Sequence, residues 1–479
     1  MSSAPRSNYT LRRANWGIEE MHSEREIVID NPSVQTDFKA EDFSVRRKRL
    51  ASTLGDGRAL LPGAPAQAGS TAFRQSNEFY YFTGVEVPHS YLLIDAAVGT
   101  SVLYLPHRNA TDEATHGPSL ASEDTEFAAS VSGVDEVRPV EQLSYDIARP
   151  LFSRSRVSNR LFVPFSPAEL AKSSRDDSMM TRAARVADPW DGEPSREGRL
   201  LANLRSRFPQ FSIHDLSPAI DELRLIKSEA ELVLMRRAGE LAAQATKAAM
   251  AATHVGQTER ELAALTLYTF ISGGARSEGY GSIIASGPAI PYGHYTRNAR
   301  TLGDGELILM DAAPDVAYYT SDMGRMWPVN GSYDRQQRAM YGYIVEYHQT
   351  TLTAIRPGRM PDEVMDEVAE IMRPRVEAYD FGDDEVRQGV IDTLSWRGHL
   401  SHPVGMSVHD DGHYRDRPLE EGMVISIDPS MWVRSRNIYV RVEDTVAVTA
   451  TGIENLTGAA PLNLDEVETL VKSSGGSTA

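Results

Sequence analysis

Carboxylates end several apolar runs in the second half of the chain. Asp311 closes the run 307–310, and Asp322 follows eleven positions later, close enough for a hairpin to bring both side chains onto one face. Asp428 ends another apolar run. Because an isolated buried carboxylate is costly, each must either keep a proton or bind a cation. These acids are therefore candidates for a cation site.

A further candidate carboxylate lies on the expected strand Tyr439-Val-Arg-Val-Glu. Strand alternation puts Tyr439, Arg441 and Glu443 on one side and the two valines on the other. An arginine and a glutamate thus project the same way from a strand that otherwise looks buried.

Histidines gather close to these acids along the chain. Four of the twelve fall within fifteen residues, namely His399, His402, His409 and His413. Imidazole beside carboxylates suits a first-row divalent ion, and a set dominated by carboxylates favours harder ions such as Mn²⁺. Four carboxylates would balance two divalent ions, whereas the same carboxylates without metal would repel one another.

Simpler roles exist for several of these residues. Taken singly, Asp311 reads as a turn former at a strand end. His399 and His413 fit a solvated loop as well as they fit a site. Arg325 is expected to pair with an acidic neighbour, and the aromatic run at residues 79–82 is expected to pack in the core or between domains.

The composition restricts the compartment and the partners. The 479 residues contain no cysteine, which excludes disulfides and thiolate metal sites. A formal charge of −18 disfavours nucleic acid and anionic membrane as partners. No stretch has the length of a membrane-spanning helix and the start lacks the apolar core of a secretory signal, so the expected compartment is the cytoplasm.

The pattern along the chain predicts an α+β protein in two domains after an N-terminal extension. The extension covers residues 1–40, and an N-terminal α/β domain covers 41–215, with an exposed insertion at about 172–199. A catalytic domain covers 216–479, where Ser228-Glu-Ala-Glu is a capping box that begins a helix. Curved antiparallel sheet with covering helices is expected there.

Taken together, these blocks resemble the pita-bread metallopeptidases, specifically the aminopeptidase P/prolidase branch, which cleaves between an amino acid and a following proline. The resemblance runs from about Ser44 to Thr457 and includes the segment Phe73-Arg-Gln-Ser-Asn-Glu-Phe-Tyr-Tyr-Phe-Thr-Gly, which is similar to the signature of the family's N-terminal domain. It implies a pita-bread fold for the catalytic domain.

The resemblance also implies roles for single residues. The implied ligands of two divalent ions are Asp311, Asp322, His402, Asp428 and Glu443. Mn²⁺ is the expected metal, with Co²⁺, Zn²⁺ or Fe²⁺ as other choices. Asp428 would also act as general base, while His294 and His409 would hold the tetrahedral intermediate and the proline end. Arg441 would fix the bridging carboxylate of Glu443.

Two positions depart from the family pattern. The usual Glu-Pro-Gly is Asp428-Pro-Ser here, and the histidine that usually precedes the ligand histidine by four positions is Gly398. Both changes bear on catalytic efficiency and substrate preference.

The expected function is hydrolysis of the bond between an N-terminal residue and proline in a peptide substrate, by a homodimer or homotetramer. Two other functions remain open from the sequence: a creatinase-like hydrolase of a C–N bond that uses histidine without metal, and a non-catalytic peptide-binding module. Dipeptides and longer peptides are equally compatible with the sequence.

Overall fold

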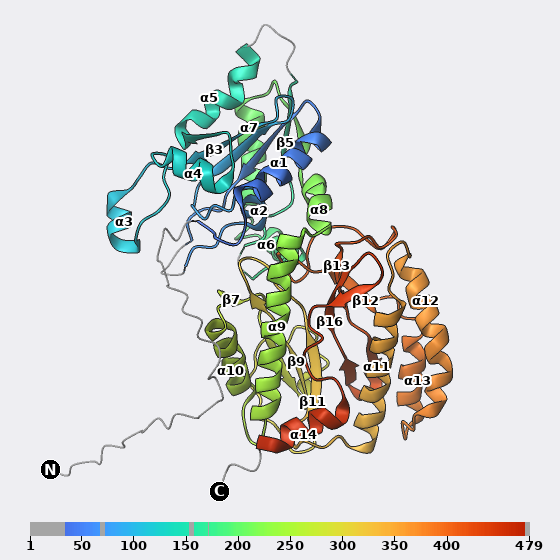
Figure 1. Ribbon diagram of the computed structural model, residues 1–479. Helices are drawn as coiled ribbons and strands as arrows, with labels where there is room; N and C mark the ends of the chain where they lie inside the picture. Colours follow the sequence, from blue (N-terminus) through green and yellow to red (C-terminus); the bar gives the residue numbers. More distant parts are fainter. Residues whose placement is uncertain (1–33, 68–71, 153–157, 171, 475–479) are drawn as a thin grey trace, which may run out of the picture.

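A computed structural model describes residues 34–67, 72–152, 158–170 and 172–474. The chain forms two parts, an upper one built around a mixed sheet and a lower one in which long helices cover antiparallel strands (Figure 1). Most of the predicted extension lies outside the described residues. The predicted boundary between residues 215 and 216 falls just after the last strand of the upper sheet and stays a prediction.

The upper part is a six-stranded sheet in the order β4-β3-β2-β1-β5-β6. The central strands β1, β2 and β3 pair antiparallel, and the remaining neighbours pair parallel. Its strands are β1 Arg58–Pro62, β2 Tyr91–Asp95, β3 Thr100–Leu105, β4 Glu136–Pro139, β5 Arg160–Val163 and β6 Ser212–Asp215. The expected strand pair after Pro88 is β2 and β3.

Helices pack around this sheet or extend from it. They are α1 Ala40–Leu54, α2 Asn77–Thr83, α3 Ala110–His116, α4 Thr125–Ser132, α5 Leu143–Ala148, α6 Arg175–Ala187 and α7 Arg196–Arg207. The aromatic run lies in α2, where all four rings are at most 1% exposed, which confirms its expected packing role. Helix α6 belongs to the predicted insertion and lies where the two parts meet (Figure 1).

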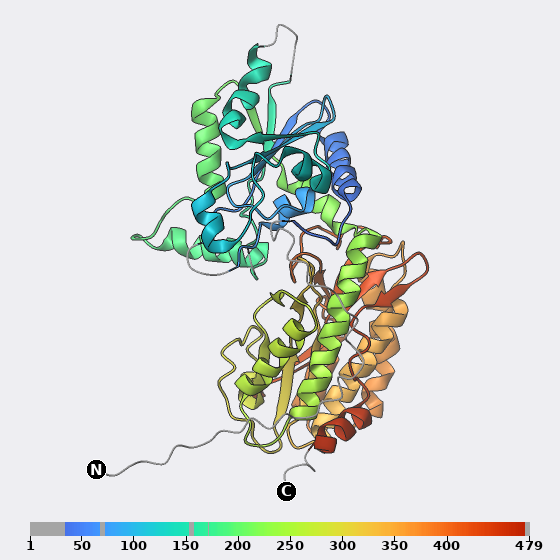
Figure 2. The same cartoon turned by 60° about the vertical axis from the view of Figure 1, so that its left-hand side comes forward.

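The lower part begins with α8 Ser217–Leu225 and the long helix α9 Glu229–Ala252. The predicted capping box is present, because Ser228 N–H donates to Glu231 Oε2 at 2.9 Å. The other helices are α10 Glu259–Ser272, α11 Arg335–Ala354, α12 Pro361–Met372, α13 Asp384–Thr393 and α14 Leu464–Ser474. Figure 2 shows α9 running along the length of the lower part.

Every strand pair of the lower part is antiparallel, as expected for the predicted curved sheet. The strands are β7 Ser277–Glu278, β8 Ile283–Ser286, β9 Leu307–Asp311, β10 Pro314–Asp315, β11 Gly324–Pro328, β12 Leu400–Pro403, β13 Val424–Ile427, β14 Ser430–Val433, β15 Ile438–Arg441, β16 Asp444–Val448 and β17 Ile453–Asn455. A bridge between Gly324 and Glu443 joins the β8–β9–β11 group to the others. A Cβ at Gly324 would lie 3.1 Å from Cβ of Glu443, so glycine permits this close approach.

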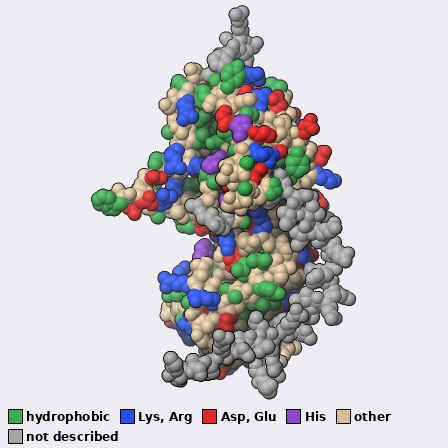
Figure 3. Space-filling view, turned by 90° about the vertical axis from the view of Figure 1, so that its left-hand side faces the viewer, with side chains coloured by type: hydrophobic (Ala, Val, Ile, Leu, Met, Phe, Trp, Pro, Cys, Tyr) green, Lys and Arg blue, Asp and Glu red, His purple; other side chains and the backbone are tan. Residues whose placement is uncertain are grey.

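Aromatic and charged contacts join the two parts. Tyr80 of α2 stacks on Tyr318 with ring centroids 3.6 Å apart, and Arg74 pairs with Asp315 at 2.9 Å. In Figure 3 the surface is hollowed where the two parts meet, and histidine and basic side chains gather at the edge of the hollow. In the described part of the chain, no helix combines the length and the apolar character that crossing a membrane requires.

Candidate metal centre

Three strand ends carry the predicted carboxylates to one place. Asp311 ends β9 and pairs in register with Gly324 of β11, and Asp322 lies just before that strand. Glu443 lies between β15 and β16 and is bridged to the same glycine. The hairpin expected for the two aspartates is therefore present.

His402 joins this group from β12. Its Nε2 lies 3.3 Å from Asp322 Oδ2, and one ligand atom each of Asp322, His402 and Glu443 lie within 4.8 Å of one another. His402 Nδ1 is 3.0 Å from the carbonyl oxygen of Pro403. A proton on Nδ1 donated to this carbonyl leaves Nε2 free to accept a metal ion.

The guanidinium of Arg441 connects the remaining acids. It hydrogen-bonds Asp311 Oδ2 and lies 3.2 Å from Glu443 Oε2 and 3.6 Å from Asp428 Oδ2. The alternation predicted for this strand is correct, since Arg441 and Glu443 face each other. One cation thus contacts three of the four carboxylates.

Tyr280 is a site residue that sequence reasoning missed. Its hydroxyl lies 2.5 Å from Asp311 Oδ1 and 2.9 Å from Asp322 Oδ1. A single proton serves one of the two acceptors at a time, so the phenol holds both aspartates in a fixed relation. A lone tyrosine in Glu278-Gly-Tyr-Gly shows no pattern that could have revealed this contact.

The carboxylates cannot all ionise easily together. Burial, followed by the charges of Glu443 and Asp311, raises the pKa of Asp322 well above its usual range. Burial and Glu443 do the same to the pKa of Asp428. Burial opposes ionisation of Glu443 too, but Arg441 and His402 outweigh it and lower its pKa.

The carboxylate oxygens, the net charge and the donor atoms of the acidic group show whether it could hold a divalent metal ion. Asp428 Oδ1 and Glu443 Oε2 are buried and accept no hydrogen bond among the described residues, although Arg441 Nη1 lies 3.2 Å from Glu443 Oε2 as an ion pair. Four carboxylates against one guanidinium leave an excess of negative charge, and the donor set contains only oxygen and imidazole nitrogen. Divalent ions suit such a set.

The structure also brings the two substrate-side histidines near this group. His409 lies with its ring centroid 4.2 Å from that of His402 and 5.9 Å from that of His294. His294 is exposed, whereas His402 and His409 are partly buried. The three imidazoles are therefore neighbours, and one of them, His402, contacts the acidic group.

The contacts of three further residues bear on the simpler roles that the sequence left open for them. His399 is fully buried and its Nε2 contacts Thr393 O at 2.8 Å, so it is a core residue, and burial lowers its pKa to about 4. His413 is exposed and lies 3.1 Å from Asp416. Arg325 pairs with buried Asp444 at 2.7 Å, as expected.

Comparison with known proteins places this geometry in a family. Residues 233–450 match the model of metallopeptidase family M24, and residues 43–158 match that of the aminopeptidase P N-terminal domain. The chain is 31% identical to the Xaa-Pro aminopeptidase of Escherichia coli over 91% of its own length and 98% of the relative's. The corresponding relative from Haemophilus influenzae is 28% identical over 90% and 97%.

Solved structures agree with this assignment. Aminopeptidase P from Escherichia coli with the inhibitor Pro-Leu superposes with a TM-score of 0.74 at 27% identity, covering 92% of this chain and all of that one, 100%. The chain belongs to the M24 metallopeptidases and carries the aminopeptidase P N-terminal domain. It is a metallopeptidase, and the fold and family expected from the sequence are confirmed.

Proposed function

We propose that this chain is an Xaa-Pro aminopeptidase, a dinuclear metal-dependent enzyme that hydrolyses the bond between an N-terminal residue and a following proline. The observation that carries the proposal is the convergence of four buried or largely buried acids and one imidazole from strands far apart in sequence. The names of the relatives support the peptide substrate. They favour this function over the creatinase-like hydrolase and the binding module.

The residues proposed to hold the metal are Asp311, Asp322, His402, Asp428 and Glu443. Two divalent ions would supply Lewis acidity, which activates water and polarises the scissile carbonyl. Mn²⁺ is the proposed ion because the set is dominated by carboxylates. The homodimeric or homotetrameric state and the cytoplasmic compartment stay predictions.

The chain's own groups divide the remaining work. Asp428 accepts the proton of the attacking water, since one oxygen of its carboxylate has no hydrogen-bond partner among the described residues. Arg441 fixes the carboxylates of Asp311 and Glu443. His409, which lies next to His402, and His294, which lies next to His409, hydrogen-bond the substrate. A proline ring is bound by an apolar pocket rather than by charge.

A peptide panel on metal-free and reloaded protein tests the proposal. The panel pairs Xaa-Pro dipeptides and tripeptides with matched Xaa-Ala peptides, after reloading with Mn²⁺, Co²⁺, Zn²⁺ or Fe²⁺. We expect release of the N-terminal residue from Xaa-Pro peptides only, and only with metal. Equal cleavage of the Xaa-Ala controls, or no product with any ion, would refute the proposal.

A further inference from the structure

A carboxylate of the upper part lies against His409, the proposed substrate-side histidine. Asp176 is in the first turn of α6, and its Oδ2 lies 2.7 Å from His409 Nδ1. The two residues are 233 positions apart in the chain. The insertion that carries α6 thus reaches the candidate active site.

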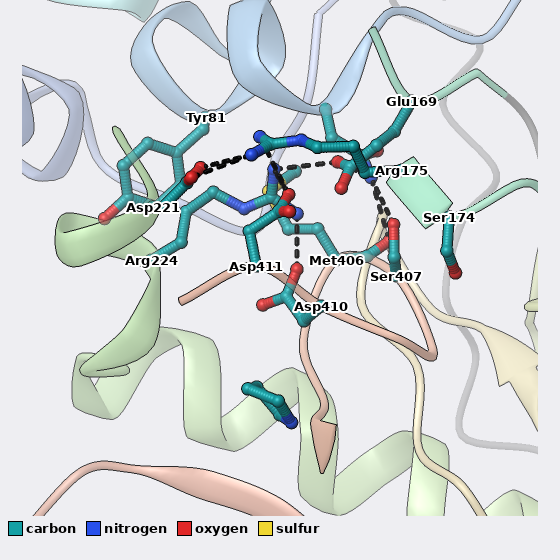
Figure 4. Close-up of polar contacts among 12 residues, drawn as sticks. Tyr81, Glu169, Ser174, Arg175, Asp221, Arg224, Met406, Ser407, Asp410 and Asp411 are labelled. Carbon is teal, nitrogen blue, oxygen red and sulfur yellow. Dashed lines mark hydrogen bonds and ion pairs between the residues drawn. The ribbon is translucent and has the colours of Figure 1, made fainter. Parts of the chain in front are cut away.

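The contact extends along both segments. The backbone N–H of His409 donates to Ser174 Oγ at 3.3 Å, and Arg175 Nη2 lies 2.9 Å from Asp411 Oδ2. Arg175 also forms two hydrogen bonds with Asp221, at 2.7 and 2.8 Å (Figure 4). Three consecutive residues, 174–176, therefore contact two residues of the loop that carries His409, namely His409 itself and Asp411.

Buried ion pairs fix the backbone just after His409. Arg224 contacts Glu169 at 2.7 Å and Asp411 at 3.2 Å, and it also pairs with Asp410 (Figure 4). Lys227 Nζ lies 3.0 Å from Asp410 Oδ2, and both side chains are only 1% exposed. Breaking a buried ion pair is strongly destabilising because it leaves a buried charge uncompensated, so these pairs hold the loop in place. Rotation of the His409 ring is then the main freedom left.

We propose that Asp176 is a positioning residue for peptide hydrolysis, acting through His409; this rests on the function proposed above. Its carboxylate accepts a hydrogen bond from Nδ1–H of His409 and holds the ring, which leaves Nε2 as the nitrogen presented to the substrate. Carboxylate partners of this kind fix the tautomer and orientation of a working imidazole. The N-terminal part thereby supplies one functional group to the active site.

A purely structural role for Asp176 makes a different prediction. Its side chain is 51% exposed, and an ion pair as exposed as this one adds little to stability. An Asp176→Ala chain therefore folds, and a structural role alone would leave turnover almost unchanged.

The test compares Asp176→Ala with Asp191→Ala, an acid of the same insertion that is 58% exposed and pairs with Arg185. We expect kcat for an Xaa-Pro tripeptide to fall about 10- to 100-fold in Asp176→Ala, with KM, metal content and unfolding midpoint unchanged. Asp176→Asn, which keeps an acceptor for Nδ1, should lie between wild type and alanine. Asp191→Ala should match wild type. Unchanged kcat in Asp176→Ala would overturn the proposal.

A double-mutant cycle tests whether Asp176 acts through His409. In a His409→Ala background, Asp176→Ala should lower kcat no further. If the two substitutions lower kcat independently, so that their effects add, the proposal is overturned. If the wild-type chain cleaves no Xaa-Pro peptide, the proposed function has failed, and the ring ¹⁵N spectrum of His409 decides the role of Asp176 alone. A wild-type spectrum in which Nδ1 carries the proton, with this tautomer preference lost in Asp176→Ala, supports the contact. Identical spectra for wild type and Asp176→Ala refute it.

Discussion

Asp411 is the neutral acid in the ion cluster between the two parts, and replacing it with asparagine should stabilise the protein. Burial, reinforced by the charge of Glu169, raises the pKa of Asp411 to about 11. The folded chain therefore keeps a proton on this carboxyl at neutral pH, where it hydrogen-bonds Glu169. An asparagine amide N–H donates the same hydrogen bond to Glu169, and the amide oxygen accepts from Arg175. Asparagine makes both contacts without taking up a proton from solution.

The magnitude follows from the difference between folded and unfolded pKa. An unfolded aspartate titrates near pH 4, so above that pH the unfolded chain releases a proton that the folded chain retains. The free energy of unfolding then falls by up to about 1.4 kcal/mol for each pH unit. Between pH 5 and pH 7 the free energy of unfolding of the wild type should fall by up to about 2.7 kcal/mol because of Asp411. In Asp411→Asn, residue 411 does not titrate and contributes no such fall.

Urea unfolding at several pH values measures this difference. The advantage of Asp411→Asn should be absent near pH 4 and grow steadily to pH 7. Asp416→Asn, which removes an acid that is 76% exposed, is the matched control and should show no such trend. A variant that is less stable than wild type at pH 7, or a difference that does not vary with pH, would show that Asp411 is ionised in the fold.

Three further outcomes follow from single contacts. Asp322→Asn should abolish both metal uptake, measured by mass spectrometry, and hydrolysis; activity in the metal-free variant would contradict the ligand assignment. Tyr280→Phe removes the hydroxyl between two aspartates and should weaken metal binding about 10- to 100-fold in a metal titration, with the fold retained in circular dichroism. Burial lowers the pKa of His399 to about 4, so as pH falls below about 6.5 this histidine takes up a proton in the unfolded chain before it does in the folded chain. The free energy of unfolding of the wild type should therefore fall by up to about 3 kcal/mol by pH 4. His399→Gln, which keeps a donor for Thr393, should flatten that slope in urea unfolding; an unchanged slope would mean that other groups cause it.

Apolar runs and strand alternation are local patterns, so they predicted the α+β class and the strand ends that carry the acids. The convergence of the five proposed ligands was implied by the resemblance to the family. Alternation placed Arg441 and Glu443 on one face, where they lie 3.2 Å apart. Contacts without a local pattern could not be predicted. Tyr280 meets two aspartates from the connection between β7 and β8, and Asp176 meets His409 only because the insertion folds across the junction.

The two departures from the family pattern lie next to each other in space. A Cβ on Gly398 would lie 2.5 Å from the indole of Trp396, so a histidine at this position would require the indole to move. The neighbouring His399 instead turns into the core, and its carbonyl oxygen accepts the N–H of Asp428 at 2.8 Å. The residue next to Gly398 therefore anchors the backbone of the shorter acid. The main-chain N–H of Asp428 thus bonds the residue that follows Gly398, so the two departures are one residue away from direct backbone contact.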